Sequence, residues 1–196
     1  KGCYAVLLTL VLGVGCGEKE EVRAVKVTSN TKAKAGAEKP LTKEAAAKII
    51  ETAIRKAIKK PTGELTEADL EKVRDLNFAY NGLTDVSGLE KLTQLTSLAL
   101  AINQQTDVPK GLEKLTQLKE IFLQYNQLTN VKGLENLTQL ERLYLNGNQL
   151  TNVTGLENLT KLERLFLNNN PDLTKAQIGE LQKALPNCTI ISNPTK

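Results

Sequence analysis

The sequence predicts an α/β solenoid built from stacked repeats, and three observations support this prediction. A nine-residue pattern, L-x-x-L-x-L-x-x-N, recurs six times with some substitutions, at intervals of 22 or 23 residues. Between the copies the apolar spacing changes from two residues, typical of a strand, to three, typical of a 3₁₀ helix. Segments with helical spacing flank the repeats on both sides. Because one copy can bury its leucines only against its neighbours, the copies are expected to stack.

The six copies supply the strands of the expected sheet. They read VRDLNFAYN (73–81), LTSLALAIN (95–103), LKEIFLQYN (118–126), LERLYLNGN (140–148), LERLFLNNN (162–170) and LPNCTIISN (185–193). This pattern resembles that of the leucine-rich repeat family, in particular the short bacterial type found in internalin-like proteins. The resemblance implies a concave parallel β-sheet of about six strands, and the apolar period of three predicts 3₁₀-like turns on the convex side. In the second copy Gln105 replaces a leucine and Lys110 is inserted, so we expect that turn to pack least well.

We expect five segments along the chain. They are a signal peptide at 1–16, a flexible tether at 17–40, a helical N-terminal cap at 41–74, the leucine-rich repeats at 73–170, and a C-terminal cap of one helix plus the final strand at 171–196. The capping signals predict helices that start at Thr42, at Thr66 with a capping box to Asp69, and at Thr174 with a capping box to Gln177. These helices would cover the apolar ends of the stack.

The N-terminal residues predict export. The apolar run CYAVLLTLVLGVG after Lys1 has the length of a signal-peptide core and is short for a transmembrane helix. Small residues precede Cys16 and a polar stretch follows it, which resembles a bacterial lipoprotein signal, although Gly13 stands where that family usually has leucine. The resemblance implies lipid on Cys16 and a membrane anchor through that lipid alone, in the bacterial cell envelope. A plain signal peptide cleaved nearby and a buried apolar segment are the alternatives.

Composition and charge argue against catalysis and against nucleic-acid binding. The chain has no His or Trp, so Cys188 lacks the usual base that would activate it, and we interpret it as a packing residue. Residues 64–196 carry 13 basic and 16 acidic side chains, so the folded part lacks the basic surface that nucleic acids require, despite a pI near 8.9. No paired nucleophile and base, metal cluster or phosphate-binding glycine loop is found. We predict that the protein is not an enzyme and has no cofactor and no metal site.

Three further sets of polar residues invite a ligand, but we interpret each as structural. The sets are the asparagines that end five copies (Asn81, Asn103, Asn126, Asn148 and Asn170), the glutamates of the turns (Glu90, Glu113, Glu135 and Glu157) and a basic cluster at the end of the first helix (Arg55, Lys56, Lys59 and Lys60). In the family that the repeats resemble, the asparagines bond backbone groups inside the solenoid. The glutamates are interpreted as a solvated edge, with calcium binding as the alternative. The basic cluster complements the helix dipole, with contact to anionic lipid as the alternative.

Alternation along the strands places three aromatic side chains on the face opposite the leucines. Phe122, Tyr144 and Phe166 occupy one position in consecutive copies, and Asn77, Ala99 and Thr189 occupy it in the others. The predicted ligand-binding residues are Phe122, Tyr144, Phe166, Tyr125, Arg142, Arg164, Gln124, Asn146 and Glu120. Aromatic residues and Arg dominate the hot spots of protein interfaces, which favours binding. Aromatic stacking that stabilises the sheet is the alternative explanation.

We therefore predict an exported, lipid-anchored monomer that binds an unidentified protein through its concave face. Phe122 and Tyr144 are expected to supply much of the affinity. A structural component of the envelope without a specific ligand and a glycan-binding module are the alternatives.

Overall fold

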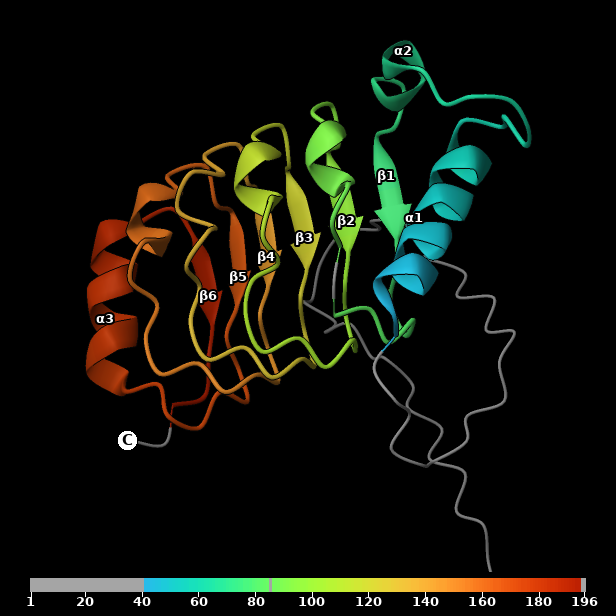
Figure 1. The fold of residues 1–196 in the computed structure, drawn as a ribbon. Coiled ribbons are helices and arrows are strands. Elements are labelled where there is room, and N and C mark those ends of the chain that lie inside the picture. The colour runs from blue at the N-terminus through green and yellow to red at the C-terminus, as the bar shows by residue number, and fades with distance from the viewer. Residues whose placement is uncertain (1–40, 85, 195–196) are drawn as a thin grey trace, which may run out of the picture. The chain divides into compact units, whose positions relative to one another are not determined.

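The computed structural model describes residues 41–84 and 86–194 of the chain (Figure 1). The predicted signal peptide with Cys16 and the predicted tether lie outside these residues. In chain order, the described elements are α1 (Lys43–Ala57), α2 (Glu67–Leu70), β1 (Asp75–Asn77), η1 (Leu89–Lys91), β2 (Ser97–Ala99), η2 (Leu112–Lys114), β3 (Glu120–Phe122), β4 (Arg142–Tyr144), η3 (Leu156–Asn158), β5 (Arg164–Phe166), α3 (Lys175–Ala184) and β6 (Thr189–Ile191). Strands, short turns and terminal helices thus follow one another as predicted for an α/β solenoid.

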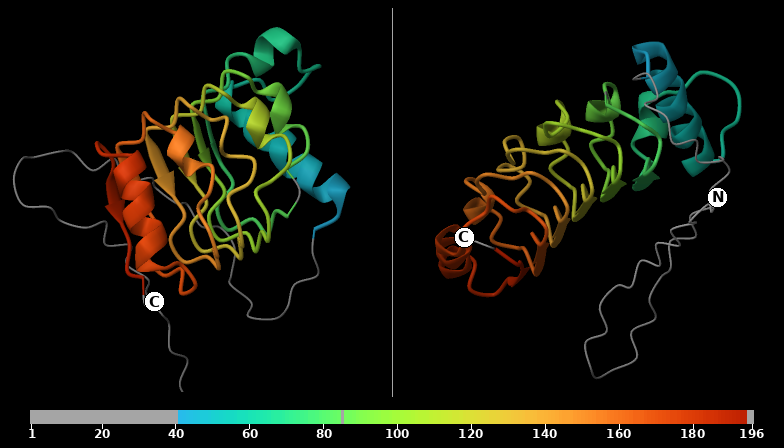
Figure 2. Two further views of the ribbon diagram at one scale, coloured as in Figure 1. Left: turned by 90° about the vertical axis from the view of Figure 1, so that its left-hand side faces the viewer. Right: turned by 90° about the horizontal axis from the view of Figure 1, so that it is seen from below.

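Six parallel strands form one sheet in chain order from β1 to β6. The middle residue of each strand pairs with the middle residue of the next, for example Leu98 with Ile121 and Leu143 with Leu165. Each coil of the chain therefore brings residues about 22 positions apart into adjacent strands. In Figures 1 and 2 the strands lie side by side along one surface and the turns lie behind them. The predicted parallel sheet of six strands is confirmed.

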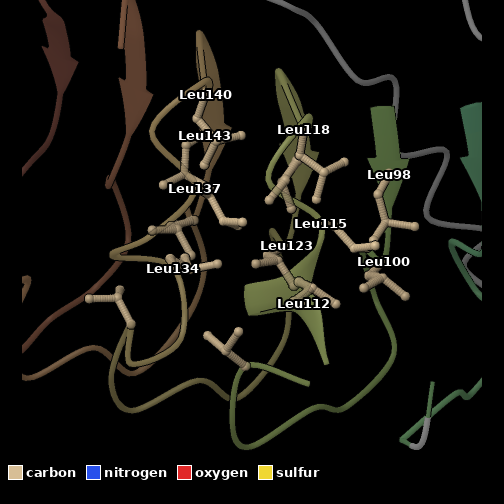
Figure 3. Close-up of a cluster of buried hydrophobic side chains, with 14 of the residues drawn as sticks. Leu98, Leu100, Leu112, Leu115, Leu118, Leu123, Leu134, Leu137, Leu140 and Leu143 are labelled. Atoms are coloured by element: carbon tan, nitrogen blue, oxygen red, sulfur yellow. The ribbon is translucent and has the colours of Figure 1, made fainter. Parts of the chain in front are cut away.

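The space between the sheet and the turns is filled by leucines (Figure 3). Leu98 and Leu143 come from the strands, whereas Leu112, Leu115 and Leu118 follow at intervals of three along one turn, and all five have no exposed surface. Alternate residues of the strands and every third residue of the turns therefore point to the same interior. Burial of one leucine side chain stabilises the fold by roughly 1.5–3 kcal/mol, so this column is the main source of stability.

The turns opposite the sheet contain the three short 3₁₀ helices η1, η2 and η3, as the apolar period of three predicted. A glycine with positive φ, such as Gly88 at 102°, precedes each helix and redirects the chain at little steric cost. The glutamate two residues later accepts a hydrogen bond from the N–H of that glycine. The pairs are Gly88 with Glu90 at 2.6 Å, Gly111 with Glu113 at 2.8 Å and Gly155 with Glu157 at 2.7 Å. The glutamate column thus has a structural role that its sequence pattern did not reveal.

The N-terminal helices begin where the capping signals placed them. The Thr42 hydroxyl accepts a hydrogen bond from the N–H of Ala45 at 3.3 Å, and α1 buries Ile50 and Ile54 on the side that contacts β1. At α2, Thr66 and Asp69 form the expected capping box. Lys60 Nζ also donates a hydrogen bond to the Asp69 carboxylate at 2.6 Å, which holds the pKa of that group well below its usual range. Lys60, one member of the basic cluster, is therefore engaged within the cap.

The C-terminal helix α3 also has its expected capping box, formed by Thr174 and Gln177. The Gln177 side chain extends further and donates a hydrogen bond to the carbonyl of Thr151 at 2.9 Å, so the start of α3 is tied to the preceding coil. Leu181 is buried beneath the helix. Together with α1 at the other end, α3 supplies the helical caps that the sequence predicted.

Gln105 places a buried polar side chain in the second coil. Its side chain is 3% exposed and lies where the other coils have Leu83, Leu128 and Leu150. Its amide nitrogen donates a long hydrogen bond of 3.4 Å to the carbonyl of Leu83, and its amide oxygen has no partner. A buried oxygen without a partner is destabilising, which agrees with the expectation that this turn packs least well.

Candidate functional site

The candidate site lies on the face of the sheet opposite the leucine core, here called the exposed sheet face. Each strand is three residues long, and in β2, β3 and β4 the middle residue is buried while both neighbours are partly exposed. The exposed sheet face therefore carries two rows from the strands themselves, one from the first residue of each strand and one from the third. Residues that follow the strands add a third row.

Phe122, Tyr144 and Phe166 form an aromatic row along the third strand position. They pair with one another in register across β3, β4 and β5 and are half-buried. The ring centroids of Phe122 and Tyr144 are 4.5 Å apart with an interplanar angle of 12°, and those of Tyr144 and Phe166 are 4.6 Å apart at 8°. Adjacent strands are separated by nearly the same distance as two stacked aromatic rings, so the three rings lie face to face. Both faces of Tyr144 are consequently covered, and ring edges point outward.

The register of the last strand differs from the sequence alignment. The alignment placed Thr189 next to Phe166, but Thr189 pairs with Arg164 and Ile191 pairs with Phe166. Helix α3 takes the place of the usual turn between β5 and β6. The length of chain that leads into β6 therefore differs from that of the other coils, and the strand is shifted by two residues relative to the alignment. The expected equivalence of Thr189 to the aromatic residues is wrong. Ile191, which is 40% exposed, extends the aromatic row instead.

Cys188 is displaced by the same shift. It lies in the turn before β6 rather than inside the strand, and Ile190 takes the central position opposite Leu165. The thiol is nevertheless buried, and burial raises its pKa to about 11. A thiol of this kind is almost fully protonated at neutral pH and is a poor nucleophile, so the packing interpretation of Cys188 is supported.

Tyr125 borders the aromatic row, as the sequence predicted. It is 41% exposed and has a left-handed backbone with φ 57°. Its ring lies over Gly147, where an added Cβ would come within 2.6 Å of the Tyr125 Cδ1 atom. The absence of a side chain at Gly147 therefore determines where the Tyr125 ring can lie. The contact between Tyr125 and Gly147 forms only when adjacent coils stack, so the sequence pattern did not predict it.

The first row of the exposed sheet face carries charge. Glu120, Arg142 and Arg164 are neighbours in register on β3, β4 and β5. Partial burial raises the pKa of Glu120, and the positive charge of Arg142 opposes that rise. Burial also raises the pKa of Tyr144, and the negative charge of Glu120 adds to the effect. The three charged groups are therefore close enough to the aromatic row to influence its central hydroxyl.

Gln124 and Asn146 lie in the third row, on the other side of the aromatic row. Both are partly exposed, and the amide oxygen of Gln124 has no hydrogen-bond partner. Eight of the nine predicted site residues, all except Tyr125, thus belong to the three rows of the exposed sheet face.

Four of the five asparagines lie inside the solenoid and are not available to a ligand, whereas Asn81 in the first copy is exposed, contrary to the expectation for the whole column. Asn126 is 7% exposed, and its side-chain oxygen accepts hydrogen bonds from the N–H groups of Asn103 and Gln105 at 2.9 and 3.1 Å. Its side-chain nitrogen donates to the carbonyls of Leu100 and Leu123, both at 3.0 Å. Asn103, Asn148 and Asn170 make similar contacts. Each of these four asparagines thus satisfies backbone groups of two adjacent coils.

Two further findings concern chemistry and membranes. Within residues 41–84 and 86–194, no group of three or more His, Cys, Asp or Glu side chains is placed to hold a metal ion. In the same residues, none of the helices has both the length and the apolar character needed to span a bilayer.

The repeats and the parallel sheet define an α/β leucine-rich repeat solenoid, a fold that supports protein interaction in general. The family model for leucine-rich repeats matches residues 116–158 and 138–187. The structure is similar to that of an internalin (inlF) from Listeria monocytogenes, with a TM-score of 0.66 and 28% identity over 75% of this chain and 44% of the other. This chain therefore spans less than half of that internalin.

An internalin C2 (inlC2) from the same organism is 24% identical, with a TM-score of 0.48, over 74% of this chain and 84% of the other. No curated protein matches the sequence of this chain.

Proposed function

We propose that this protein is an exported, lipid-anchored module that binds a protein partner through the exposed sheet face. The observation that carries the proposal is the aromatic row. Phe122, Tyr144 and Phe166 remain partly exposed on an open sheet, although the chain has only seven aromatic residues in all. Partly exposed aromatic residues next to Arg have the composition of an interface hot spot.

The shape of the row favours a protein partner over a glycan. Sugars stack on the open faces of aromatic rings, but both faces of Tyr144 are covered by its neighbours at 4.5 and 4.6 Å. The outward ring edges and the aliphatic side chain of Ile191 instead form a ridge against which apolar side chains can pack. A polypeptide supplies such side chains at regular intervals.

The alternative is a structural component that binds no specific ligand. In that case the aromatic row exists to stabilise the sheet, since cross-strand pairs contribute roughly 0.2–1 kcal/mol each. The binding function and the structural alternative predict different effects when the aromatic rings are removed. Loss of stacking lowers stability in both, whereas loss of binding occurs only in the first.

A pull-down separates these functions. The chain is used as bait for envelope and culture-medium proteins, alongside the Phe122→Ala, Tyr144→Ala, Phe166→Ala triple variant, after circular dichroism has confirmed that both fold. Tyr80→Ala is the matched control, because Tyr80 is 57% exposed but lies outside the row. We expect a partner that is retained by the parent and by the control and is lost by the triple variant. Partners that bind all three equally would support the structural alternative.

Export and anchoring are tested separately. The proposal predicts that cells fed a labelled fatty acid incorporate it into this protein through Cys16. Cys16→Ser should abolish the label, whereas Cys3→Ser, a change within the predicted signal segment, should not. Unchanged labelling of Cys16→Ser would exclude lipid attachment at this residue and leave a plain signal peptide as the explanation.

A further inference from the structure

Arg142 and Arg164 lie side by side on the exposed sheet face without an ion-pair or hydrogen-bond partner. They are register neighbours on β4 and β5, Arg142 half-buried and Arg164 exposed. Among residues 41–84 and 86–194, neither guanidinium forms an ion pair or a hydrogen bond. The other long basic side chain near this part of the sheet, Lys119, is already paired with Glu141 at 2.9 Å. The two arginines therefore offer all of their N–H donors to a ligand.

The sheet itself offsets the positive charge of the pair only in part, through the electrostatic attraction between Glu120 and Arg142. Like charges directly opposite each other on adjacent strands are destabilising. Glu120 is the register neighbour of Arg142 on β3, but its carboxylate forms no ion pair with Arg142, and β6 places the uncharged Thr189 beside Arg164. An anion bound between the two guanidinium groups would remove the repulsion and accept several hydrogen bonds.

The surroundings of the arginines indicate which kind of anion fits. Tyr144 and Phe166 follow them by two residues and lie on the same face, so an anionic group at the arginines is next to the aromatic row. Ile191 adds an exposed aliphatic side chain at the end of that row. Because the faces of Tyr144 are covered, sugar stacking is disfavoured at its centre. Negative charge beside apolar side chains is the chemistry of an acidic polypeptide segment.

We propose that Arg142 and Arg164 bind Asp or Glu side chains of the partner, in a segment whose apolar side chains pack on the aromatic row. This inference rests on the proposed function and specifies its partner by charge. In an extended segment, acidic and apolar residues two positions apart lie on one side of the chain, which matches the spacing of each arginine from its aromatic neighbour.

The test uses a displayed library of random twelve-residue peptides, selected on the immobilised parent chain and, in parallel, on the Arg142→Gln, Arg164→Gln double variant. The matched control is Lys91→Gln with Lys114→Gln, which makes the same change in charge at exposed residues of the turns. We expect the parent and the control to select peptides rich in Asp and Glu next to apolar residues, and the double variant to lose this acidic preference. The affinity of the best acidic peptide should fall by about tenfold or more in the double variant and stay within about twofold in the control.

Several outcomes would overturn the inference. They are a parent that selects no peptides, selected peptides without acidic enrichment, and equal affinity of the acidic peptide for the parent and the double variant. A sulfated heparin hexasaccharide is tested in the same way. If it binds through both arginines while acidic peptides do not, the site recognises an anionic glycan and the inference is wrong.

The same experiment separates this inference from the proposed function. Peptides that lack acidic residues but still require Phe122, Tyr144 and Phe166 would refute the arginine assignment and leave the protein-binding function intact. Acidic peptides that bind the triple alanine variant as tightly as the parent would show that the aromatic row is not part of the site, which counts against both. Circular dichroism of every variant identifies any loss of binding that comes from unfolding.

Discussion

At the scale of single residues, Gln105 is the clearest departure from the repeat. Leu83, Leu128 and Leu150 at the equivalent positions are fully buried, and Gln105 is buried almost as completely. Its amide replaces apolar packing with one long hydrogen bond and one oxygen that lacks a partner. A buried polar group of this kind costs about 1–3 kcal/mol relative to a satisfied one. The coil therefore contains a local defect that a single substitution can repair.

We predict that Gln105→Leu increases the free energy of unfolding by about 1–3 kcal/mol, because it removes the unpaired oxygen and adds apolar burial. Urea unfolding followed by circular dichroism measures the change. Gln127→Leu is the control, since Gln127 is exposed in the next coil and its substitution should change stability by less than about 0.5 kcal/mol. A Gln105→Leu protein no more stable than the parent would show that the amide is better satisfied than its contacts indicate.

At the scale of elements, the asparagine ladder joins successive coils. Asn148 accepts a hydrogen bond from the N–H of Leu128 at 3.0 Å and donates to the carbonyls of Leu123 and Leu145 at 3.0 and 2.9 Å. Asn81 has the same place in the sequence pattern, but it is exposed and its side chain bonds only the carbonyl of Ala79. The difference arises because no repeat coil precedes the first copy, so Asn81 has no earlier backbone to satisfy.

Asn148→Ala should therefore destabilise the protein by about 1–3 kcal/mol, because it leaves the buried N–H of Leu128 without a partner. The carbonyls of Leu123 and Leu145 each lose one of two hydrogen bonds and keep those from Asn126 and Asn170. Asn81→Ala, which changes the same residue type at the same repeat position, should cost less than about 1 kcal/mol. Chemical denaturation of both variants gives the comparison. Equal losses at the two positions would contradict the role assigned to the ladder.

At the scale of the whole described region, the solenoid depends on its ends. A stack of repeats exposes apolar surface at its first and last coil, and terminal caps are needed to cover it. Helix α1 contacts β1 through a face that buries Ala46, Ile50 and Ile54. At the other end, α3 packs near η3.

We predict that Ile50→Asp detaches α1 from β1 and causes self-association, because it places a charge in the contact and exposes the apolar end of the stack. Size-exclusion chromatography with light scattering measures the oligomeric state. Ala47→Asp, an exposed change on the same helix, should leave the elution unchanged. Retention of the parent's elution volume by Ile50→Asp would show that the cap is not needed for solubility.

The sequence by itself determined the repeat length, the inward leucines, the 3₁₀ turns, the capped terminal helices and the face on which the candidate site lies. These features depend on local spacing, because alternation in a strand and a period of three in a turn decide which side chains point inward. Eight of the nine site residues could be placed on one face for the same reason, whereas Tyr125 lies beyond the alternating strand and has a left-handed backbone. Six copies of one pattern made each assignment consistent with the others.

Only the tertiary structure decided how neighbouring coils meet. It placed Ile191 rather than Thr189 beside Phe166, since a helix in the last coil changes the path length of the chain before the final strand. It covered the faces of Tyr144, put the ring of Tyr125 over Gly147 and left Arg142 and Arg164 adjacent without an ion-pair or hydrogen-bond partner. These contacts join residues more than 20 positions apart, and their geometry depends on the strand spacing and register that arise only when the coils stack.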